Sequence, residues 1–381
     1  MSHPPVTHAE IVVDLAAVRH NVRARREMVA PAQMMTVVKA DGYGHGMVEV
    51  AAAARQAGTD WLGVATVEEA LALRAAGDIG PLLCWLDVPG ERYSEAIQRD
   101  IDVTAYTLAE LDAIAGSAHH VHRPARLQLK IDTGLSRGGA AAGDWPGLVA
   151  SAARLQDRGL VRVTGIWSHF ACSDEPDHPA NDAQEQAFRD ALAVAEGAGL
   201  RPEVRHLANS AAAVLRPSSR FDLVRCGIAS YGLDPAPGVT PDLGLVPAMT
   251  VRARLVLSKP VTTGAGVSYG HTWTADRDTT VGLVPVGYGD GVPRHGSGTA
   301  EVWAEGRRRP VRGRVCMDQF VVDLDGDLPE AGAEVVLFGT GQHGEPTAQD
   351  WAEACGTINY EIVTRIGGRM SRRHVDEGTR A

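Results

Sequence analysis

The sequence predicts an α/β fold, in which an N-terminal (β/α)8 TIM-type barrel is followed by a C-terminal mainly-β domain. Up to about residue 235, short β-branched runs alternate with helical patterns, which is typical of repeated βα units around a parallel sheet. From about Leu243 the sequence changes to alternating strands with glycine-rich turns. The chain of 381 residues is long enough for two domains.

Nine strand-like runs precede residue 235, one more than a (β/α)8 barrel needs. They are Ile11–Asp14, Met34–Lys39, Trp61–Ala65, Leu82–Leu86, Ile101–Ala105, Leu127–Ile131, Val161–Trp167, Val204–Leu207 and Phe221–Val224. We assign the first run to the second domain's sheet, because a chain terminus is the segment most easily donated to a neighbour. The alternative is an open doubly wound sheet, but no Gly-x-Gly-x-x-Gly turn follows the first strand.

Capping chemistry and apolar stripes indicate the helices between these runs. Thr66-x-x-Glu69 and Thr107-x-x-Glu110 match the capping box, and Asn181-x-x-Gln184 is a looser version that predicts a helix start. Apolar residues at helical spacing form two stripes: Leu15, Val18, Val22 and Val29 in one, and Phe188, Leu192 and Ala195 in the other.

The C-terminal part contains six further strand-like runs. They are Met249–Leu257, Thr280–Pro285, Ala300–Trp303, Val311–Cys316, Phe320–Leu324 and Glu334–Phe338. A helix over Ala348–Ala354 and a basic tail follow, and the stretch from Pro235 to Pro241 has linker composition. We therefore expect an N-terminal segment at 1–10, the barrel at 11–240 and the β-domain at 241–381.

Composition excludes several classes of function. The chain has 37 Lys and Arg against 47 Asp and Glu, a net charge of −10, which disfavours nucleic acid and anionic membranes as partners. Its five cysteines form no Cys-x-x-Cys pair, so neither a disulfide framework nor a metal site is expected. There is no signal-peptide pattern and no apolar run of the roughly 18 residues that a membrane helix requires, so we expect a cytoplasmic protein.

The segment from Val37 to Gly46 carries the clearest chemical signal. Lys39 ends a predicted buried strand, and barrel enzymes hold their active sites at the C-terminal ends of their strands. A lysine that is partly desolvated there, near other cations, has a lowered pKa and can form a Schiff base. Three glycines within the following loop allow the backbone to approach a ligand closely.

These residues open an ordered series of motifs that resembles the alanine racemase family. The series comprises Val38-Lys-Ala-Asp-Gly-Tyr-Gly-His-Gly46, Lys130-Ile-Asp-Thr-Gly134 with Arg137, Ser168-His-Phe170, Asn209-Ser-Ala211, Val224-Arg-Cys-Gly-Ile228, Val267-Ser-Tyr-Gly270, Gly287-Tyr-Gly-Asp-Gly291, Cys316-Met-Asp318 and Ile358-Asn-Tyr-Glu361. The resemblance covers about residues 9–365 and implies pyridoxal 5'-phosphate as the cofactor, a barrel with a C-terminal β-domain, and a homodimer with composite sites.

The resemblance also implies the catalytic roles. Lys39 would hold the cofactor and move the Cα proton on one face of the substrate, and Tyr269 of the other subunit would be the base on the opposite face. His169 and Arg225 would activate that tyrosine, because an unperturbed tyrosine has a pKa near 10. Arg225 would face the pyridine nitrogen, where a permanent cation disfavours ring protonation and so limits side reactions.

Binding and supporting roles follow from the same resemblance. The phosphate would be held by Tyr43, Asn209, Ser210, Gly227, Ile228 and Tyr360. Arg137 would bind the cofactor's phenolic oxygen and the substrate carboxylate, which the Met317 backbone of the other subunit would also bind. Supporting or entry positions are Lys130, Asp174, His206, Tyr288, Arg294, Arg314, Cys316, Asp318 and Ile358.

Lys130 shares a small region with Arg137, and members of the resembled family often carry this lysine as a carbamate; the alternative is an ion pair with Asp132. The tail departs from the family's usual ending, which leaves its contacts open.

We therefore expect a racemase that interconverts L- and D-alanine. The alternatives are a racemase of serine or another small amino acid, a fold-sharing amino-acid decarboxylase, and a non-catalytic cofactor-binding protein on the same barrel.

Overall fold

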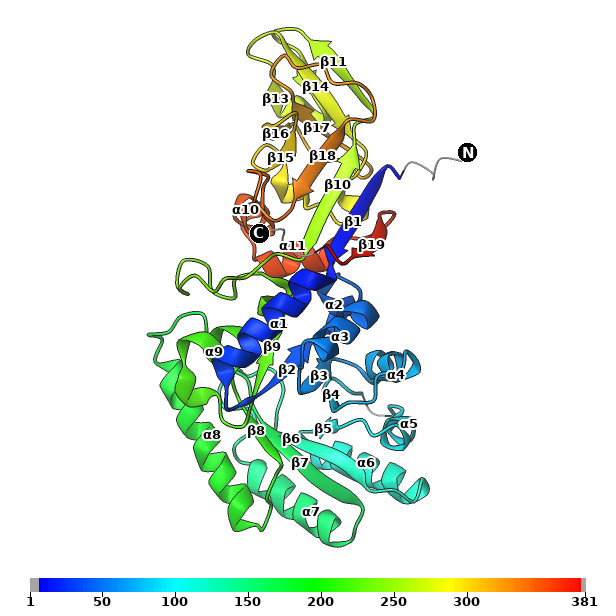
Figure 1. The fold of residues 1–381 in the computed structure, drawn as a ribbon. Helices are drawn as coiled ribbons and strands as arrows, with labels where there is room; N and C mark the ends of the chain where they lie inside the picture. Colours follow the sequence, from blue (N-terminus) through cyan, green and yellow to red (C-terminus); the bar gives the residue numbers. More distant parts are fainter. Residues whose placement is uncertain (1–6, 89, 378–381) are drawn as a thin grey trace.

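The computed structural model describes residues 7–88 and 90–377. Residues 1–6 of the expected N-terminal segment and residues 378–381 of the expected C-terminal domain lie outside the described residues. Figure 1 shows an α/β barrel at one end of the molecule and a β-domain at the other, with the first strand running beside the β-domain. The predicted fold class is confirmed.

Eight parallel strands form the barrel. They are β2 (Gln33–Val37), β3 (Trp61–Val64), β4 (Leu82–Cys84), β5 (Val103–Ala105), β6 (Ala125–Lys130), β7 (Val161–Trp167), β8 (Val204–His206) and β9 (Leu223–Cys226). They pair as two four-stranded sheets, β4-β3-β2-β9 and β5-β6-β7-β8. A parallel bridge between Leu83 and Asp102 joins one seam, and the Arg225 amide donates to the Ala208 carbonyl at 3.0 Å across the other.

Helices cover the outside of this barrel (Figure 1), and shorter helical turns, such as that of Lys39, lie at the ends of its strands. They are α1 (Leu15–Val29), α2 (Lys39–Tyr43), α3 (Met47–Gln56), α4 (Val67–Ala75), α5 (Tyr93–Gln98), α6 (Leu108–His120), α7 (Trp145–Asp157), α8 (Ala180–Gly197) and α9 (Ser210–Leu215), with 3-10 turns η1 (Pro217–Ser219) and η2 (Ile228–Tyr231). Both predicted capping boxes, at Thr66 and Thr107, are present. The prediction of a cap at Asn181 is wrong, because its side chain lies inside α8 and donates to the Cys172 and Glu175 carbonyls.

The β-domain is built on a nine-stranded sheet in the order β11-β14-β17-β16-β15-β18-β10-β1-β19. Its strands are β1 (Ala9–Asp14), β10 (Met249–Arg254), β11 (Leu257–Val261), β14 (Thr279–Val284), β15 (Glu301–Ala304), β16 (Arg307–Arg312), β17 (Phe320–Asp323), β18 (Glu334–Phe338) and β19 (Ser371–Val375). The smaller elements are β12 (Gly266–Val267), η3 (Tyr269–His271), β13 (Trp273–Thr274), η4 (Tyr288–Asp290), η5 (Arg294–Gly296), α10 (Ala348–Cys355) and α11 (Asn359–Arg365). The first strand of the chain pairs antiparallel with β10 and parallel with β19, so it belongs to this sheet.

Two strand predictions in the β-domain are wrong in detail. The run over 249–257 breaks after Arg254, and its last residue begins β11. The run over 311–316 is displaced, because the strand begins at Arg307. Arg308 is paired with Asp350 at 3.0 Å, and Arg309 is buried against Asp327. Acidic partners from elsewhere in the chain therefore stabilise these arginines within the strand, although their sequence alone resembles a turn.

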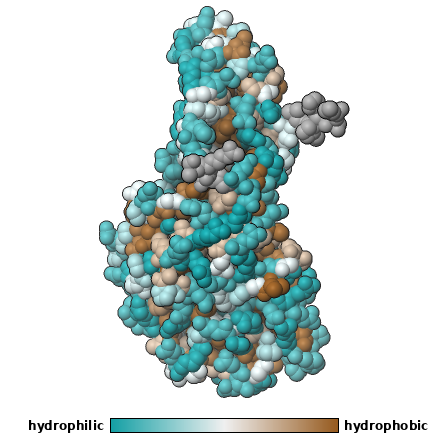
Figure 2. Space-filling view, in the orientation of Figure 1, coloured by the Kyte–Doolittle hydropathy of each residue, from teal (hydrophilic) through white to brown (hydrophobic). Residues whose placement is uncertain are grey.

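The outer surface of the molecule is mainly polar. On the face shown in Figure 2, hydrophilic residues cover most of the surface and hydrophobic residues occur in small groups. Within residues 7–88 and 90–377, no helix combines the length and apolar character needed to cross a membrane.

Candidate active site

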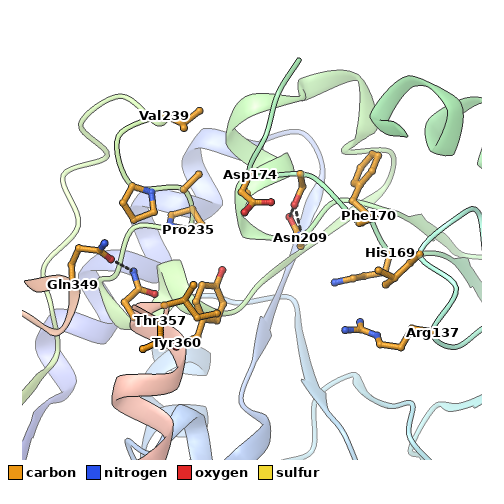
Figure 3. Close-up of a pocket in the computed structure, with 18 residues that line it drawn as sticks. Arg137, His169, Phe170, Asp174, Asn209, Pro235, Val239, Gln349, Thr357 and Tyr360 are labelled. Carbon is orange, nitrogen blue, oxygen red and sulfur yellow. Dashed lines mark hydrogen bonds between the residues drawn. The ribbon is translucent and has the colours of Figure 1, made fainter. Parts of the chain in front are cut away.

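A cavity of about 590 Å³ lies where the loops after β6, β7 and β8 meet α11. In Figure 3, Arg137 and His169 lie on one side, Thr357 and Tyr360 face them, and Asp174 and Asn209 lie above. The cavity is therefore at the C-terminal ends of the barrel strands, the face on which barrel enzymes bind substrates. Six of the predicted site residues line it: Arg137, His169, Asp174, Asn209, Ile358 and Tyr360.

Lys39 follows β2 and begins a turn with unusual backbone geometry. Ala40, Asp41, Gly42 and Tyr43 all have φ between 52° and 61°. Three of these are not glycine, so the left-handed conformation is strained and must be held by its surroundings. The Ala40 amide donates to Glu69 Oε1 at 2.7 Å, and the Met47 amide donates to Asp41 Oδ1 at 3.0 Å. These contacts fix the loop that carries the lysine.

The Lys39 amine lies in an environment that favours its neutral form. Burial lowers the pKa of Lys39, and the charge of Arg137 lowers it further, while Glu69 opposes this effect. A neutral amine is the form that attacks a carbonyl or accepts a proton. This environment suits the role that the sequence suggests for this residue.

Hydroxyl and amide groups converge behind the loop of Lys39. Ser210 Oγ accepts a hydrogen bond from the Gly227 amide at 2.9 Å. A Cβ added to Gly227 would lie 2.3 Å from Tyr43 Oη, so only glycine lets the tyrosine hydroxyl approach this point. The Tyr43 and Tyr360 rings lie 6.3 Å apart, and burial raises the pKa of both well above the ordinary value. These tyrosines remain neutral hydrogen-bond donors, which suits an anionic group.

Arg225 on β9 is buried and surrounded by neutral acceptors. It donates to His206 Nδ1 at 2.8 Å, to His169 Nδ1 at 3.1 Å and to the carbonyl of Ser168 at 2.7 Å. Among the described residues it forms no ion pair with a carboxylate. Its charge is therefore not neutralised and is available to a group bound in front of it.

The protonation of His169 follows from this contact. Its Nδ1 accepts from Arg225, so the neutral ring carries its proton on Nε2. Burial and the charges of Arg225, Arg137, Lys130 and Lys39 hold the pKa of His169 well below its ordinary value. His169, which lines the cavity, thus has an N–H donor on Nε2 with no hydrogen-bond partner in residues 7–88 and 90–377.

Lys130, at the end of β6, is buried without an acidic partner among the described residues. Its Nζ lies 4.5 Å from the centre of the Trp167 ring and 5.7 Å from that of Tyr106. Burial together with the charges of Arg225 and Arg137 lowers the pKa of Lys130 to about 8, and Asp132 opposes the shift. The alternative of an ion pair between Lys130 and Asp132 is not found.

Seven further predicted residues form a second group in the β-domain, and none of them lines this cavity; Lys39, Tyr43, Ser210 and Arg225 also lie outside its lining. The seven are Tyr269, Tyr288, Arg294, Arg314, Cys316, Met317 and Asp318. Ser268 Oγ donates to the Arg314 carbonyl at 2.7 Å, and the amide of Gly289 donates to the Met317 carbonyl at 2.9 Å. Tyr269 is 71% exposed and Met317 is 55% exposed. The side chains of Tyr269 and Met317 are therefore accessible to another molecule.

Comparison with known proteins identifies the family. The model of the alanine racemase N-terminal domain matches residues 13–235, and that of the C-terminal domain matches residues 248–374. The chain belongs to the alanine racemase family. An alanine racemase of Streptomyces coelicolor is 55% identical over 379 residues, which cover 98% of this chain and 97% of that protein.

Solved alanine racemases share the fold. The enzyme from D-cycloserine-producing Streptomyces lavendulae is 53% identical, with a TM-score of 0.96 and 98% of each chain covered. The alanine racemase of Bartonella henselae, solved with covalently bound pyridoxal phosphate, is 29% identical, with a TM-score of 0.87 and coverage of 97% of this chain and 100% of that one.

The residues of this alanine racemase family member fit pyridoxal phosphate. The chain contains three lysines, of which Lys259 lies on exposed β11 and Lys130 lies against two aromatic rings. Burial lowers the pKa of both Lys39 and Lys130, but only Lys39 lies in a loop beyond its strand, whereas Lys130 is the last residue of β6. The neutral donors around Ser210 suit the phosphate, and the unneutralised Arg225 suits a pyridine nitrogen that stays unprotonated.

Several structural contributors were not recognised in the sequence. The Tyr231 hydroxyl donates to the Val37 carbonyl at 2.9 Å, and its ring lies 4.9 Å from that of Tyr43. Trp167 stacks on His206 with ring centroids 5.5 Å apart. Trp167 is the last residue of a strand, which weakly indicates a place near the site. Nothing in the local sequence distinguishes Tyr231 from a core tyrosine.

Proposed function

We propose that this protein is an alanine racemase, a cytoplasmic isomerase that interconverts L- and D-alanine with pyridoxal 5'-phosphate. The observation that carries the proposal is the combination of a Lys39 amine with a pKa lowered by burial, a set of neutral hydrogen-bond donors for a phosphate, and a buried Arg225 that pairs with no carboxylate in the described part of the chain. When bound, the cofactor supplies an electron sink that makes the Cα proton of an amino acid acidic.

Two bases on opposite faces would move that proton. Lys39 is the base on one side, and its lowered pKa favours proton abstraction near neutral pH. Tyr269 of a second subunit is the base on the other side; it is largely exposed in a single chain. The Nε2–H of His169 is free to donate to that phenol oxygen and so to stabilise its anionic form.

The same cavity would select a small amino acid. Arg137, which lines the cavity, binds the substrate carboxylate together with the Met317 backbone of the second subunit. Asp174 and Ile358 border the entry from this chain, while Tyr288, Arg294 and Arg314 border it from the partner. Cys316 and Asp318 flank Met317 and hold its backbone in place, with Arg369 paired to Asp318 at 2.8 Å.

A homodimer with composite sites follows from this division of residues. Arg137 and His169 line the barrel cavity, whereas Tyr269 and Met317 lie exposed in the β-domain of the same chain. We place the domain boundary near residue 240, with the barrel at 11–240 and the β-domain at 241–381. The product D-alanine would serve as a precursor of peptidoglycan.

The decisive experiment incubates the purified protein, loaded with pyridoxal phosphate, with individual L-amino acids and separates the products on a chiral column. We expect L- and D-alanine to reach equal concentrations from either enantiomer, because the two have the same free energy in water. Preferential racemisation of serine would assign the alternative substrate. Release of carbon dioxide with formation of an amine would show a decarboxylase instead.

A further inference from the structure

A buried chain of hydrogen bonds runs from Arg225 away from the cavity into the barrel. Arg225 donates to His206 Nδ1 at 2.8 Å, and His206 Nε2 lies 2.7 Å from Gln128 Oε1. Gln128 Nε2 in turn donates to Asp102 Oδ2 at 3.2 Å. His206, Gln128 and Asp102 have no exposed surface, so each of these polar groups depends on its neighbour in the chain.

Arg225 and Asp102, at the two ends of this series of hydrogen bonds, determine which group donates and which accepts in each bond. Asp102 accepts from Arg126 Nε at 2.6 Å and from Thr164 Oγ1 at 2.5 Å. An acceptor at this end requires the NH2 group of Gln128 to face it, which turns the amide oxygen toward His206. Arg225 can only donate, so it requires the lone pair of His206 Nδ1. Both ends therefore require a neutral His206 with its proton on Nε2.

The backbone makes room for this arrangement. The register between β6 and β7 shifts at Leu127/Gln128, so that Thr164 is an extra residue and Gly165 lies opposite Gln128. A Cβ on Gly165 would lie 2.5 Å from Gln128 Oε1. Bulges beside active sites often redirect a side chain, and this one brings both Thr164 and Gln128 within reach of Asp102.

We propose that Gln128, oriented by Asp102, is a positioning residue for the reaction: it is a neutral acceptor that anchors the His206 ring with its Nδ1 lone pair directed at Arg225. His206 in turn helps to keep the Arg225 guanidinium facing the cofactor ring. The Trp167 ring lies parallel to the His206 ring, and its centre is 4.9 Å from the Arg225 guanidinium carbon, so it packs against both side chains. The proposal rests on the proposed function only for the role of Arg225.

The first test measures the tautomer of His206 directly, independently of turnover. The protein loaded with cofactor is labelled with nitrogen-15 histidine, and the ring nitrogens are observed by NMR. We expect a protonated Nε2 and an unprotonated Nδ1 for His206, with no titration across the pH range in which the protein is folded. A proton on Nδ1, or a doubly protonated ring, would overturn the proposal even if racemase activity is present.

The second test compares variants of Gln128. Gln128→Met keeps the length of the side chain but removes the acceptor, and we expect loss of the protected Nε2–H signal and a fall in kcat of about tenfold with little change in KM. Gln128→Glu should retain both, because two buried carboxyl groups this close share a proton and the protonated Glu can donate to Asp102 while it accepts from His206.

Gln156→Met is the matched control, since it removes the hydrogen bond that the Val163 amide donates to Gln156 Oε1, which is not part of the series from Arg225 to Asp102. It should leave the His206 signals and kcat unchanged. If Gln128→Met resembles the wild type, or if Gln128→Glu is as impaired as Gln128→Met, Gln128 is only a packing residue and the proposal is wrong.

Discussion

At the scale of single residues, the lysine content of the chain makes the cofactor attachment unusually easy to test. Borohydride reduction should fix the cofactor to one peptide, found by mass spectrometry, that contains Lys39. Lys39→Ala should abolish this covalent label and reduce activity by at least about a thousandfold. Lys259→Ala on exposed β11 is the control and should label like the wild type. Label on the peptide of Lys130 or Lys259 would contradict the assignment.

Tyr269→Ala separates the two proposed bases. It should slow removal of the Cα proton from L-alanine by at least about a hundredfold, because a positioned base contributes that much, while removal from D-alanine by Lys39 is affected far less. The measurement is the rate of deuterium uptake in heavy water from each enantiomer. Equal losses for the two enantiomers would argue against two bases.

Lys130 carries a pH-dependent prediction. Carbon dioxide reacts with a neutral amine, and the pKa of Lys130 is lowered to about 8 by burial and by the charges of Arg225 and Arg137. The neutral fraction therefore rises as the pH rises through about 8, and carbamate formation should rise with it. Carbon-13 bicarbonate should give a carbamate signal that is absent in Lys130→Ala. An unlabelled lysine throughout this range would contradict the prediction.

At the scale of elements, the C-terminal strand β19 supports the loop of Lys39. Arg372 Nη1 lies 2.6 Å from Asp41 Oδ2, and His374 Nε2 lies 2.8 Å from the His45 carbonyl. Arg373 alternates with Arg372 along β19 and pairs with Glu10 at 3.3 Å. The C-terminal strand β19, which departs from the family's usual ending, thus contacts the loop that follows Lys39.

Arg372→Ala should therefore weaken cofactor retention, whereas Arg373→Ala should not. Both ion pairs are partly exposed, so each substitution should cost the fold only about 0.2–1 kcal/mol. Equilibrium dialysis of the cofactor separates the two variants, with thermal unfolding as the common measure of stability. Equal cofactor loss in both variants would mean that β19 acts only through general stability.

The elements that the sequence revealed are those with a repeating pattern. Parallel barrel strands are buried on both faces and appear as continuous apolar runs, so all eight could be recognised. The exposed strand β11 and the arginine-rich β19 lack such a pattern, and their pairing depends on distant parts of the chain.

In the candidate site too, only residues within a local sequence pattern could be recognised from the sequence. The Lys39 loop could be recognised from its own chemistry, and the other residues depended on the family resemblance. The array of Asp102, Gln128 and His206 joins three different strands or strand ends across the barrel, and no local spacing reveals such contacts.

At the scale of the whole molecule, one chain separates the two halves of the proposed site. The cavity at the barrel mouth includes Arg137 and His169, whereas the exposed Tyr269 lies between β12 and β13 in the β-domain. In Figure 1, β13 lies at the far side of the β-domain from the barrel. The central claim is that a second copy brings its Tyr269 to this cavity.

Subunit complementation tests this claim most directly. Lys39→Ala and Tyr269→Ala chains, each inactive alone as a homodimer, are mixed, unfolded and refolded together. If each site takes Lys39 from one subunit and Tyr269 from the other, half of the dimers are mixed and each has one intact site, so about a quarter of the wild-type activity should return. No recovery, with mixed dimers verified by mass spectrometry, would show that each site is complete within one chain.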